Sequence, residues 1–526
     1  MDSQSIQILI AMVIYMAAVI GIGVFYAKRA NKNSENYFLG GRSLGPWVTA
    51  MSAEASDMSG WLLMGLPGVA YWFGLADAAW TAIGLAIGTY LNWLIVSKRL
   101  RRYSIRANNS ITLPDFFSNR FREKKKILLT VAALFILVFF TVYAASCLVT
   151  CGKLFSTLFF GGKYYQLMMI VGALFVLLYT ILGGFLAESA SDFMQAIVMV
   201  GALIVVLIVG VANAGGIGAV IQNAQSIDGY FMLFGVANPS VDASGAQIGG
   251  LFGAGSNYPA LSVVSAMAWG LGYFGMPHIL IRFMAVKNET EMKKSRKIAI
   301  AWVTLSFIAS ILIGIVGRAY LSAQLNDATS ETVFIRMIQQ LFDNNWFIIF
   351  IGGVFLCGIL AAIMSTADSQ LLVTASAVSE DMYSGVIKKD ASEKSSLRVG
   401  KIAVIVIAVI AFVIALNPNS SIMGLVSNAW AGFGAAFGPV VLLGLFWKRS
   451  NSAGALAGML SGAAAVILWD YIPMINGATL GAITGLYSLA VGFPVSMLMM
   501  FIVSLVTKAP SKEIVEEFES VKTLDV

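Results

Sequence analysis

The sequence predicts an all-α polytopic membrane protein, and its composition and the length of its apolar runs are the observations that predict it. Of 526 residues, 58% are hydrophobic and only 12% are charged. A chain this apolar cannot cover itself with polar surface in water, which excludes a soluble enzyme or a disordered chain. About thirteen runs approach or exceed the roughly 20 apolar residues that a membrane helix needs. A transmembrane β-barrel would instead show short, weakly alternating segments.

The apolar runs divide the chain in order. The first is too long for a signal-peptide core and is expected to be a retained helix. The runs lie near residues 6–27, 47–73, 75–97, 127–159, 164–184, 189–213, 256–283, 298–323, 345–378, 400–416, 422–447, 453–473 and 480–506. We therefore expect an extra N-terminal helix and cytoplasmic loop (1–46), a first five-helix repeat (47–213), an extracellular loop (214–255), a second five-helix repeat (256–447), two additional C-terminal helices (448–506) and a cytoplasmic tail (507–526).

The positive charges orient these spans. All of the 34 Lys and Arg except Lys153, Lys163, Arg318 and Arg336 lie in six segments that thirteen spans place on one side of the membrane. The long segment 214–255 falls on the other side and has no Lys or Arg. This positive-inside bias predicts a cell-membrane protein with its N-terminus outside and its C-terminus in the cytoplasm. The net charge of +7 therefore indicates topology and lipid contact, not nucleic-acid binding.

The second run is interrupted by polar residues. Two carboxylates, three hydroxyls and a glycine occur between Ser52 and Gly60, in the sequence SAEASDMSG. Serine and glycine loosen a helix, and the exposed carbonyl oxygens together with Asp57 would offer hard ligands to a small cation such as Na⁺. The alternative is an ordinary capped helix end facing the cytoplasm.

The ninth run carries a second oxygen-rich group. Ala362, Ser365 and Thr366 are spaced i, i+3 and i+4, so they share one face of a helix. Their hydroxyls and a carbonyl could complete the coordination of a cation. Close helix–helix packing explains the same small residues equally well.

The seventh run is interrupted by three glycines and a proline. Trp269, Tyr273 and Pro277 recur at i, i+4 and i+8, which predicts one aromatic face beside free backbone N–H groups. Such a face suits a small ligand with an apolar body and a carboxylate. The alternative is a kinked helix whose aromatic face packs against its neighbours.

Two interrupted spans at matching positions of two five-helix sets point to the binding site of a secondary transporter. Asp192 opens another span, either as a second cation ligand or as a helix-capping carboxylate. No GxxxxGK[ST] motif is present, which argues against an ATP-driven pump. The absence of a nucleophile–base set argues against an enzyme, and three cysteines with one histidine do not provide a transition-metal site. An ion channel or sensor stays open as a different class.

Four segments resemble the sodium/solute symporter family, and its sodium/proline branch most closely. They begin at Ser52 (SAEASDMSGWLLMGLPG), Ala268 (AWGLGYFGMPHIL), Met364 (MST) and Asn428 (NAWAGFGAAFGPVV). The resemblance covers nearly the whole chain. It implies a LeuT-like core of ten helices in two inverted five-helix repeats, with one extra helix before the core and two after it.

The resemblance also implies roles for individual residues. A sodium ion would be held by carbonyls of Ala55, Met58 and Ala362 and hydroxyls of Ser365 and Thr366, with Asp57 tied to coupling. Trp269, Tyr273, Pro277 and Tyr143 would contact the substrate, together with Ser59, Gly60 and Trp61. The predicted function is Na⁺-coupled import of L-proline by alternating access, without any cofactor other than the coupling ion. A sibling symporter for another small carboxylate or amino acid is the alternative. Glu54 and Asp368 depart from the pattern of that branch and add carboxylates to the membrane interior.

Overall fold

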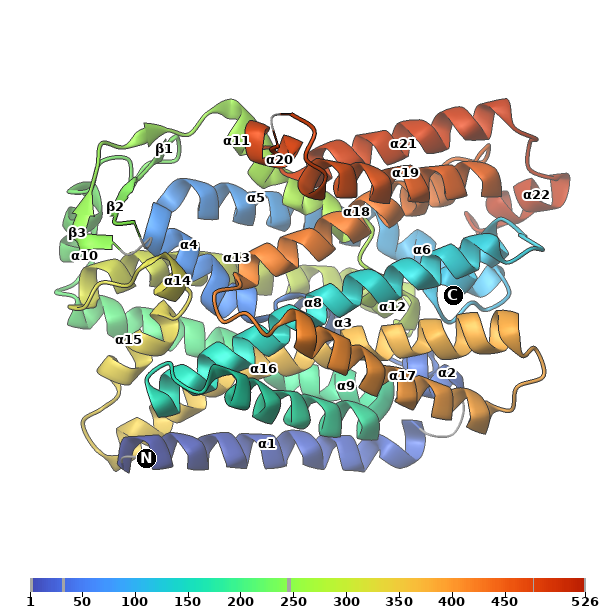
Figure 1. Cartoon of the computed structure of the whole chain (residues 1–526). Helices are drawn as coiled ribbons and strands as arrows, with labels where there is room; N and C mark the ends of the chain where they lie inside the picture. The colour runs from blue at the N-terminus through green and yellow to red at the C-terminus, as the bar shows by residue number, and fades with distance from the viewer. Residues whose placement is uncertain (1–2, 31–33, 244–246, 476, 525–526) are drawn as a thin grey trace.

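The protein is a bundle of long helices in the computed structural model, which describes residues 3–30, 34–243, 247–475 and 477–524. The two ends of the chain lie at opposite ends of this bundle (Figure 1). Within the described residues, ten helices are long and apolar enough to cross a membrane, or eleven if one bent pair counts as a span. The long elements are α1 (Ser3–Ala30), α5 (Leu75–Leu91) with its continuations η3 (Asn92–Val96) and α6 (Ser97–Arg106), α8 (Ile127–Phe160), α9 (Tyr165–Asn213), α13 (Glu289–Tyr320), α16 (Trp346–Ser376) with η5 (Ala377–Ile387), α17 (Glu393–Ile414), α18 (Ile422–Phe446), α19 (Ser452–Tyr471) and α21 (Ser488–Val506).

The remaining expected spans are interrupted helices. The first interruption divides α3 (Pro46–Asp57) from the π-helical turn η2 (Trp61–Gly65) and α4 (Leu66–Phe73). The bent pair joins α11 (Ala260–Met267) and the 3₁₀ segment η4 (Ala268–Phe274) to α12 (Pro277–Ala285) at an angle of 44°. Both breaks fall where the sequence predicts them, because the glycines, serines and Pro277 disfavour a continuous α-helix.

Two expected spans, 164–184 and 189–213, form the single long element α9. Gly184 divides it with a backbone conformation of φ 58° and ψ −179° that lies outside the helical region. Only glycine adopts such a conformation without strain. The second half of α9 therefore starts at Gly184, several residues earlier than the sequence indicates.

The long segment 214–255 is not entirely helical, although the chain is predicted to be all-α. It contains α10 (Ile217–Gln225) and β1 (Gly235–Val236), β2 (Pro239–Val241) and β3 (Gln247–Phe252), while β4 (Ser256–Asn257) follows it. Strand β1 pairs with β4 and β2 pairs with β3, both antiparallel. Short helices α14 (Asp327–Ser330) and α15 (Val333–Leu341) lie at the same end of the bundle (Figure 1).

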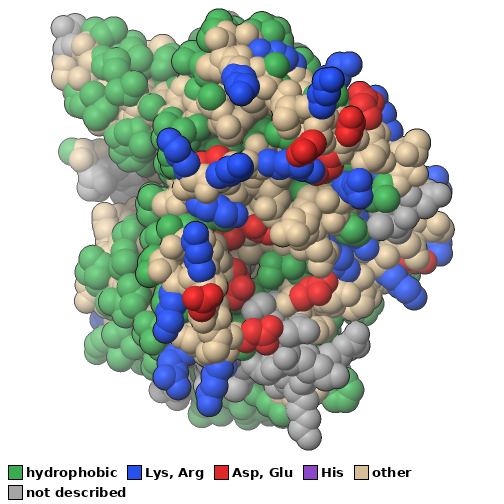
Figure 2. Space-filling model, turned by 90° about the vertical axis from the view of Figure 1, so that its right-hand side faces the viewer, with side chains coloured by type: hydrophobic (Ala, Val, Ile, Leu, Met, Phe, Trp, Pro, Cys, Tyr) green, Lys and Arg blue, Asp and Glu red, His purple; other side chains and the backbone are tan. Residues whose placement is uncertain are grey.

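The opposite end of the bundle carries most of the basic residues. Lys and Arg are numerous over this end, which is the face shown in Figure 2. Its short helices are α2 (Ser34–Leu39), η1 (Gly40–Arg42), α7 (Leu113–Arg120) and α22 (Lys512–Ser520). The tail helix α22 is docked, since Phe518 is buried and the guanidinium of Arg99 lies 4.6 Å from its ring centroid. A further short helix, α20 (Leu480–Thr484), lies in the chain between α19 and α21.

The arrangement of helices places both breaks in the interior. Helix α1 runs along one edge of the bundle, and α19 and α21 run along the opposite edge (Figure 1). Between these edges, α3 packs against α9, α13, α12 and α16. The two interrupted helices are thus surrounded by protein, where the groups that their breaks leave unpaired can meet side chains from neighbouring helices.

Candidate functional site

The first break exposes backbone oxygen atoms in the middle of the bundle. Helix α3 ends at Asp57, and Met58 leaves helical geometry with φ −84° and ψ 67°. The Ser59 amide turns back to the carbonyl of Asp57 (3.0 Å) instead of continuing the helical ladder. The carbonyl of Ala55 is therefore free of its usual partner and accepts a hydrogen bond from the hydroxyl of Ser365, 2.8 Å away on α16.

The hydroxyl of Ser365 lies among more acceptors than it can satisfy. Besides Ala55, the carbonyl oxygens of Ala361 and Ala362 lie 2.8 and 3.3 Å from it, and a hydroxyl has only one hydrogen to donate. Next to it, the hydroxyl of Thr366 is buried and has no hydrogen-bond partner among the described residues. The break and α16 thus bring together the neutral oxygen atoms that a hard monovalent cation requires.

Asp57 links the first break to the second. Its carboxylate accepts a hydrogen bond from the hydroxyl of Tyr273 over 2.6 Å, while its other carboxylate oxygen has no partner in the part of the chain that the structure describes. Its backbone carbonyl accepts from the Tyr143 hydroxyl and the Trp61 indole N–H, each over 3.2 Å. The fully buried Asp57 therefore links α3 to η4 through its side chain and to α8 through its backbone carbonyl.

The aromatic side chains of η4 do not follow the single helical face that their spacing predicts. Segment η4 is a 3₁₀-helix, so residues four apart are rotated by roughly 120° from each other. Tyr273 points to Asp57, whereas Trp269 stacks on Tyr487 with 5.1 Å between ring centroids. Pro277 starts α12 beyond the break.

Trp430 of α18 joins the two aromatic groups, and the sequence analysis did not identify it as a site residue. Its indole N–H donates to the carbonyl of Trp269 over 2.7 Å, and its ring meets Tyr273 edge to face at 5.0 Å. Only a glycine fits at position 272, because a Cβ there would lie 1.9 Å from the Trp430 indole nitrogen. Trp430 lies in the segment beginning at Asn428 that resembles the known family, and this resemblance was the signal in the sequence that could have identified it.

The residues that follow the first break are packed tightly against neighbouring helices. A Cβ on Gly60 would lie 2.4 Å from the side chain of Thr150, so α8 approaches the backbone here. The ring of Trp61 packs against Phe307 of α13 at 5.8 Å. Ser59, which precedes Gly60 and follows Asp57 by two residues, is fully buried as well. The predicted sodium and substrate residues are all buried, so this conformation closes the site to solvent on both sides.

A buried charge cluster lies close to the oxygen-rich break, and its centre is Arg282 of α12. The guanidinium donates to Glu188 and, over 3.2 Å, to Asp192, both on the second half of α9. It also donates to Ser52 of α3 (2.8 Å) and to Ser369 of α16 (2.7 Å). Four helices therefore meet at one fully buried cation.

Two predictions about this cluster are corrected by the structure. Arg282 was counted with the basic segments on one side of the membrane, but it is wholly buried. Glu188 and Asp368 are buried within the protein as well. Asp192 does not cap a helix, since it lies well inside the second half of α9 and pairs with Arg282 and the Ser52 hydroxyl. One oxygen of Asp192 has no partner among the described residues.

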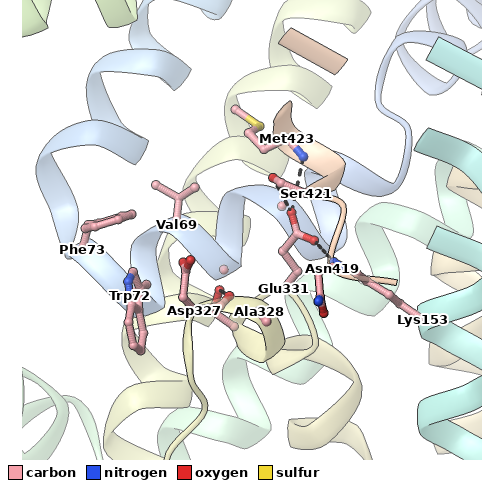
Figure 3. Close-up of a pocket in the computed structure, with 13 residues that line it drawn as sticks. Val69, Trp72, Phe73, Lys153, Asp327, Ala328, Glu331, Asn419, Ser421 and Met423 are labelled. Atoms are coloured by element: carbon pink, nitrogen blue, oxygen red, sulfur yellow. Dashed lines mark hydrogen bonds and ion pairs between the residues drawn. The ribbon is translucent and has the colours of Figure 1, made fainter. Parts of the chain in front are cut away.

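At the end of the bundle that carries the strands, Glu331 lies between α14 and α15 (Figure 3). Its carboxylate binds the ammonium of Lys153 at 2.6 Å and accepts the backbone N–H of Ile422 at 2.9 Å, at the start of α18. A carboxylate is stabilised at a helix N-terminus by the helix dipole. A pocket of about 150 Å³ lies beside this contact and is bordered by Trp72 and Asp327. From the sequence, Lys153 was noted only as one of four basic residues outside the six basic segments, and Glu331 was not identified.

Comparison with known proteins places these features in one family. The model of the sodium:solute symporter family matches residues 37–462. The chain is 43% identical to the osmoregulated proline transporter OpuE of Bacillus subtilis over 97% of this chain and 96% of that protein. It is 44% identical to the high-affinity proline transporter PutP of Bacillus subtilis (94% and 98% covered) and 42% identical to the sodium/proline symporter of Escherichia coli (98% and 96% covered).

The fold is shared with solved transporters of low sequence identity. A Na⁺-coupled sialic acid symporter in a substrate-bound outward-open state superposes with a TM-score of 0.73 at 19% identity, over 96% of this chain and 99% of that one. MhsT in complex with L-phenylalanine superposes with a TM-score of 0.54 at 14% identity, over 88% of this chain and 98% of that one. The predicted fold class, with its LeuT-like core, is confirmed.

Proposed function

Because the chain is a member of the sodium:solute symporter family and hence a multi-pass membrane transporter, we propose that it imports L-proline together with Na⁺ by alternating access. The relatives named as proline transporters support the substrate, since they exceed 40% identity over nearly their full length. The buried contact between Ser365 and the freed carbonyl of Ala55 is the observation that carries the cation part of the proposal.

In this proposal the sodium ion is bound by carbonyls of Ala55, Met58 and Ala362 and hydroxyls of Ser365 and Thr366. When the ion is bound, the hydrogen of the Ser365 hydroxyl would turn to the carbonyl of Ala361, 2.8 Å away. The oxygen atoms of Ser365 and Ala55 would then both face the ion, which would bridge α16 and α3. The hydroxyl of Thr366, which has no hydrogen-bond partner in the described part of the chain, supplies a ligand without breaking any contact seen there. A second cation site is assigned to Asp192, one of whose carboxylate oxygens has no partner among the described residues while the other pairs with Arg282.

The substrate site follows from Asp57, which sits next to these ligands and holds the Tyr273 hydroxyl. Sodium binding fixes the break and so orients Tyr273, and the substrate in turn stabilises the sodium-bound form, because such coupling is reciprocal. Substrate contacts are assigned to Trp269, Tyr273, Pro277, Tyr143, Ser59, Gly60 and Trp61. An aromatic wall and the backbone N–H groups of a broken helix suit an apolar ring that carries a carboxylate.

The chain is oriented with its N-terminus outside and its C-terminus in the cytoplasm. The basic end of the bundle, which holds α22, is then cytoplasmic. The segment 214–255 and the contact of Glu331 with Lys153 are then extracellular. Inward movement of Na⁺ down the membrane potential supplies about 2.3 kcal/mol per charge for each 100 mV.

The proposal is tested by uptake of labelled L-proline into proteoliposomes with and without an inward Na⁺ gradient. We expect accumulation only with the gradient, and competition by unlabelled proline. Stronger competition by another small carboxylate or amino acid would assign the chain to a sibling substrate. Sodium flux that is not saturable and needs no solute would favour a channel and contradict the symporter.

A further inference from the structure

A groove on the outside of the bundle combines two basic side chains with an apolar floor. It has a volume of about 680 Å³ and lies between Tyr90 of α5 and one face of α13. Arg296 and Lys297 line its basic end, and the rest of its α13 wall includes Thr304, Leu305 and Ile308. These features describe an amphipathic surface on the membrane-facing side of a transporter.

The side chains of Arg296 and Lys297 make no hydrogen bond and no ion pair with any residue that the structure describes. The acidic residues of the first turn of α13 are already engaged, since Glu289 pairs with Lys98 at 2.7 Å and Glu291 with Lys294 at 3.4 Å. This end of the groove therefore presents positive charge with which an anion from outside the chain can pair.

The floor of the groove has the chemistry and the length of one lipid chain. Leu305 and Ile308 are about half exposed, at 46% and 53%. The hydroxyl of Thr304 donates to the carbonyl of Ile300 over 2.8 Å, so this side chain presents its methyl group outward. The eleven-residue rise from Lys297 to Ile308 is about 16 Å, which is about half the thickness of the hydrocarbon core.

A second external groove shows what is specific to the first. A groove of about 450 Å³ between α9, α10 and α13 is lined only by apolar side chains, such as Leu207, Val220 and Phe231. That groove can accept an acyl chain but has no group that selects a headgroup. The cations at one end distinguish the groove that holds Arg296.

We propose that the groove between α5 and α13 is a binding site for one anionic phospholipid, with the headgroup phosphate on Arg296 and Lys297 and one acyl chain along Thr304, Leu305 and Ile308. Basic pockets between membrane helices on the cytoplasmic side recognise headgroups in this way. Each cation near an anionic headgroup contributes a factor of about five in affinity, and the two together about 30-fold.

The test is native mass spectrometry of the full-length, delipidated protein titrated with phosphatidylglycerol or with phosphatidylcholine of the same chains. We expect the first phosphatidylglycerol to bind about 30-fold more tightly than phosphatidylcholine. The double variant Arg296→Gln/Lys297→Gln is expected to lose this preference. The matched control Lys388→Gln/Lys389→Gln removes two adjacent exposed cations elsewhere on the basic end and is expected to keep it.

Two further experiments test whether binding needs the apolar floor of the groove and whether a phosphate compound without an acyl chain can replace the lipid. Thr304→Trp keeps both cations but fills the floor, and we expect it to weaken binding of both lipids. Glycerol phosphate, which has a headgroup but no chain, should not displace phosphatidylglycerol at equal concentration. Displacement by glycerol phosphate, no headgroup preference in the unmodified protein, or equal losses in the two double variants would each overturn the proposal. A thermal unfolding transition measured for each variant checks that the variant is folded.

Discussion

Replacing Thr366 by Val should weaken sodium binding without destabilising the folded protein, because it removes only one proposed sodium ligand. The hydroxyl is buried and makes no hydrogen bond within the described residues, so its removal breaks no contact of the protein itself. We therefore expect the free energy of unfolding without sodium not to fall, and to rise by up to about 1–3 kcal/mol, because a buried hydroxyl without a partner carries a desolvation cost. Valine keeps the branched shape of threonine, which limits any packing defect.

The expected loss in sodium affinity follows from the loss of one charged contact. A contact between a charged group and a neutral hydroxyl is worth about 1.5–3 kcal/mol. Since each 1.4 kcal/mol corresponds to tenfold, the sodium concentration for half-maximal proline uptake should rise by about 10- to 150-fold. Uptake into proteoliposomes at varied Na⁺ and saturating proline measures this shift, and thermal unfolding in sodium-free buffer measures the stability.

Thr374→Val is the matched control, because it removes a buried threonine hydroxyl from the same helix two turns away. That hydroxyl donates to the carbonyl of Gln370 over 2.6 Å, within α16 and outside the proposed site. Its sodium dependence should be unchanged. The reasoning would be refuted if Thr366→Val left half-maximal sodium unchanged, or if Thr374→Val shifted it equally.

Three other perturbations test the remaining contacts. Tyr273→Phe removes the hydrogen bond to Asp57 and should raise the proline KM about 10-fold or more in uptake assays, with an unchanged KM arguing against this contact in the loaded site. Arg282→Gln strands two buried carboxylates and should lower the free energy of unfolding by about 3–5 kcal/mol, and adding Glu188→Gln should recover part of that loss in thermal unfolding. Phe518→Ala should release α22 and speed proteolysis after residue 507. High salt should act in the same direction by screening the pairs of Arg122 with Glu513 and Glu517, whereas a cleavage rate insensitive to both changes would contradict docking.

The backbone of the site was predictable because its causes are local. Serines around Asp57 and the glycines before Pro277 weaken helices whatever their neighbours do, so both breaks follow from the sequence. The i, i+3 and i+4 spacing of Ala362, Ser365 and Thr366 likewise fixes their common face within a regular helix. These features need no knowledge of which helices become neighbours.

The features that were missed depend on tertiary contacts. Arg282 is followed by a basic segment, and only the approach of α9 and α16 provides the carboxylate and hydroxyl that bury it. The 3₁₀ geometry of η4 changes the direction of Trp269 and accompanies the close contact of Gly272 with Trp430. Glu331 is one residue between two short helices, and its partners Lys153 and Ile422 are about 180 and 90 positions away in the chain.

The sharing of Arg282 between distant helices also constrains how the protein is made. Glu188 and Asp192 leave the ribosome about 90 residues before the arginine that neutralises them. Until α12 arrives, the second half of α9 would present two carboxylates to lipid, which a lone helix tolerates poorly. These carboxylates therefore need a polar environment, such as the translocation machinery or water, until α12 is inserted. The bundle can assemble fully only after Arg282 has reached the membrane.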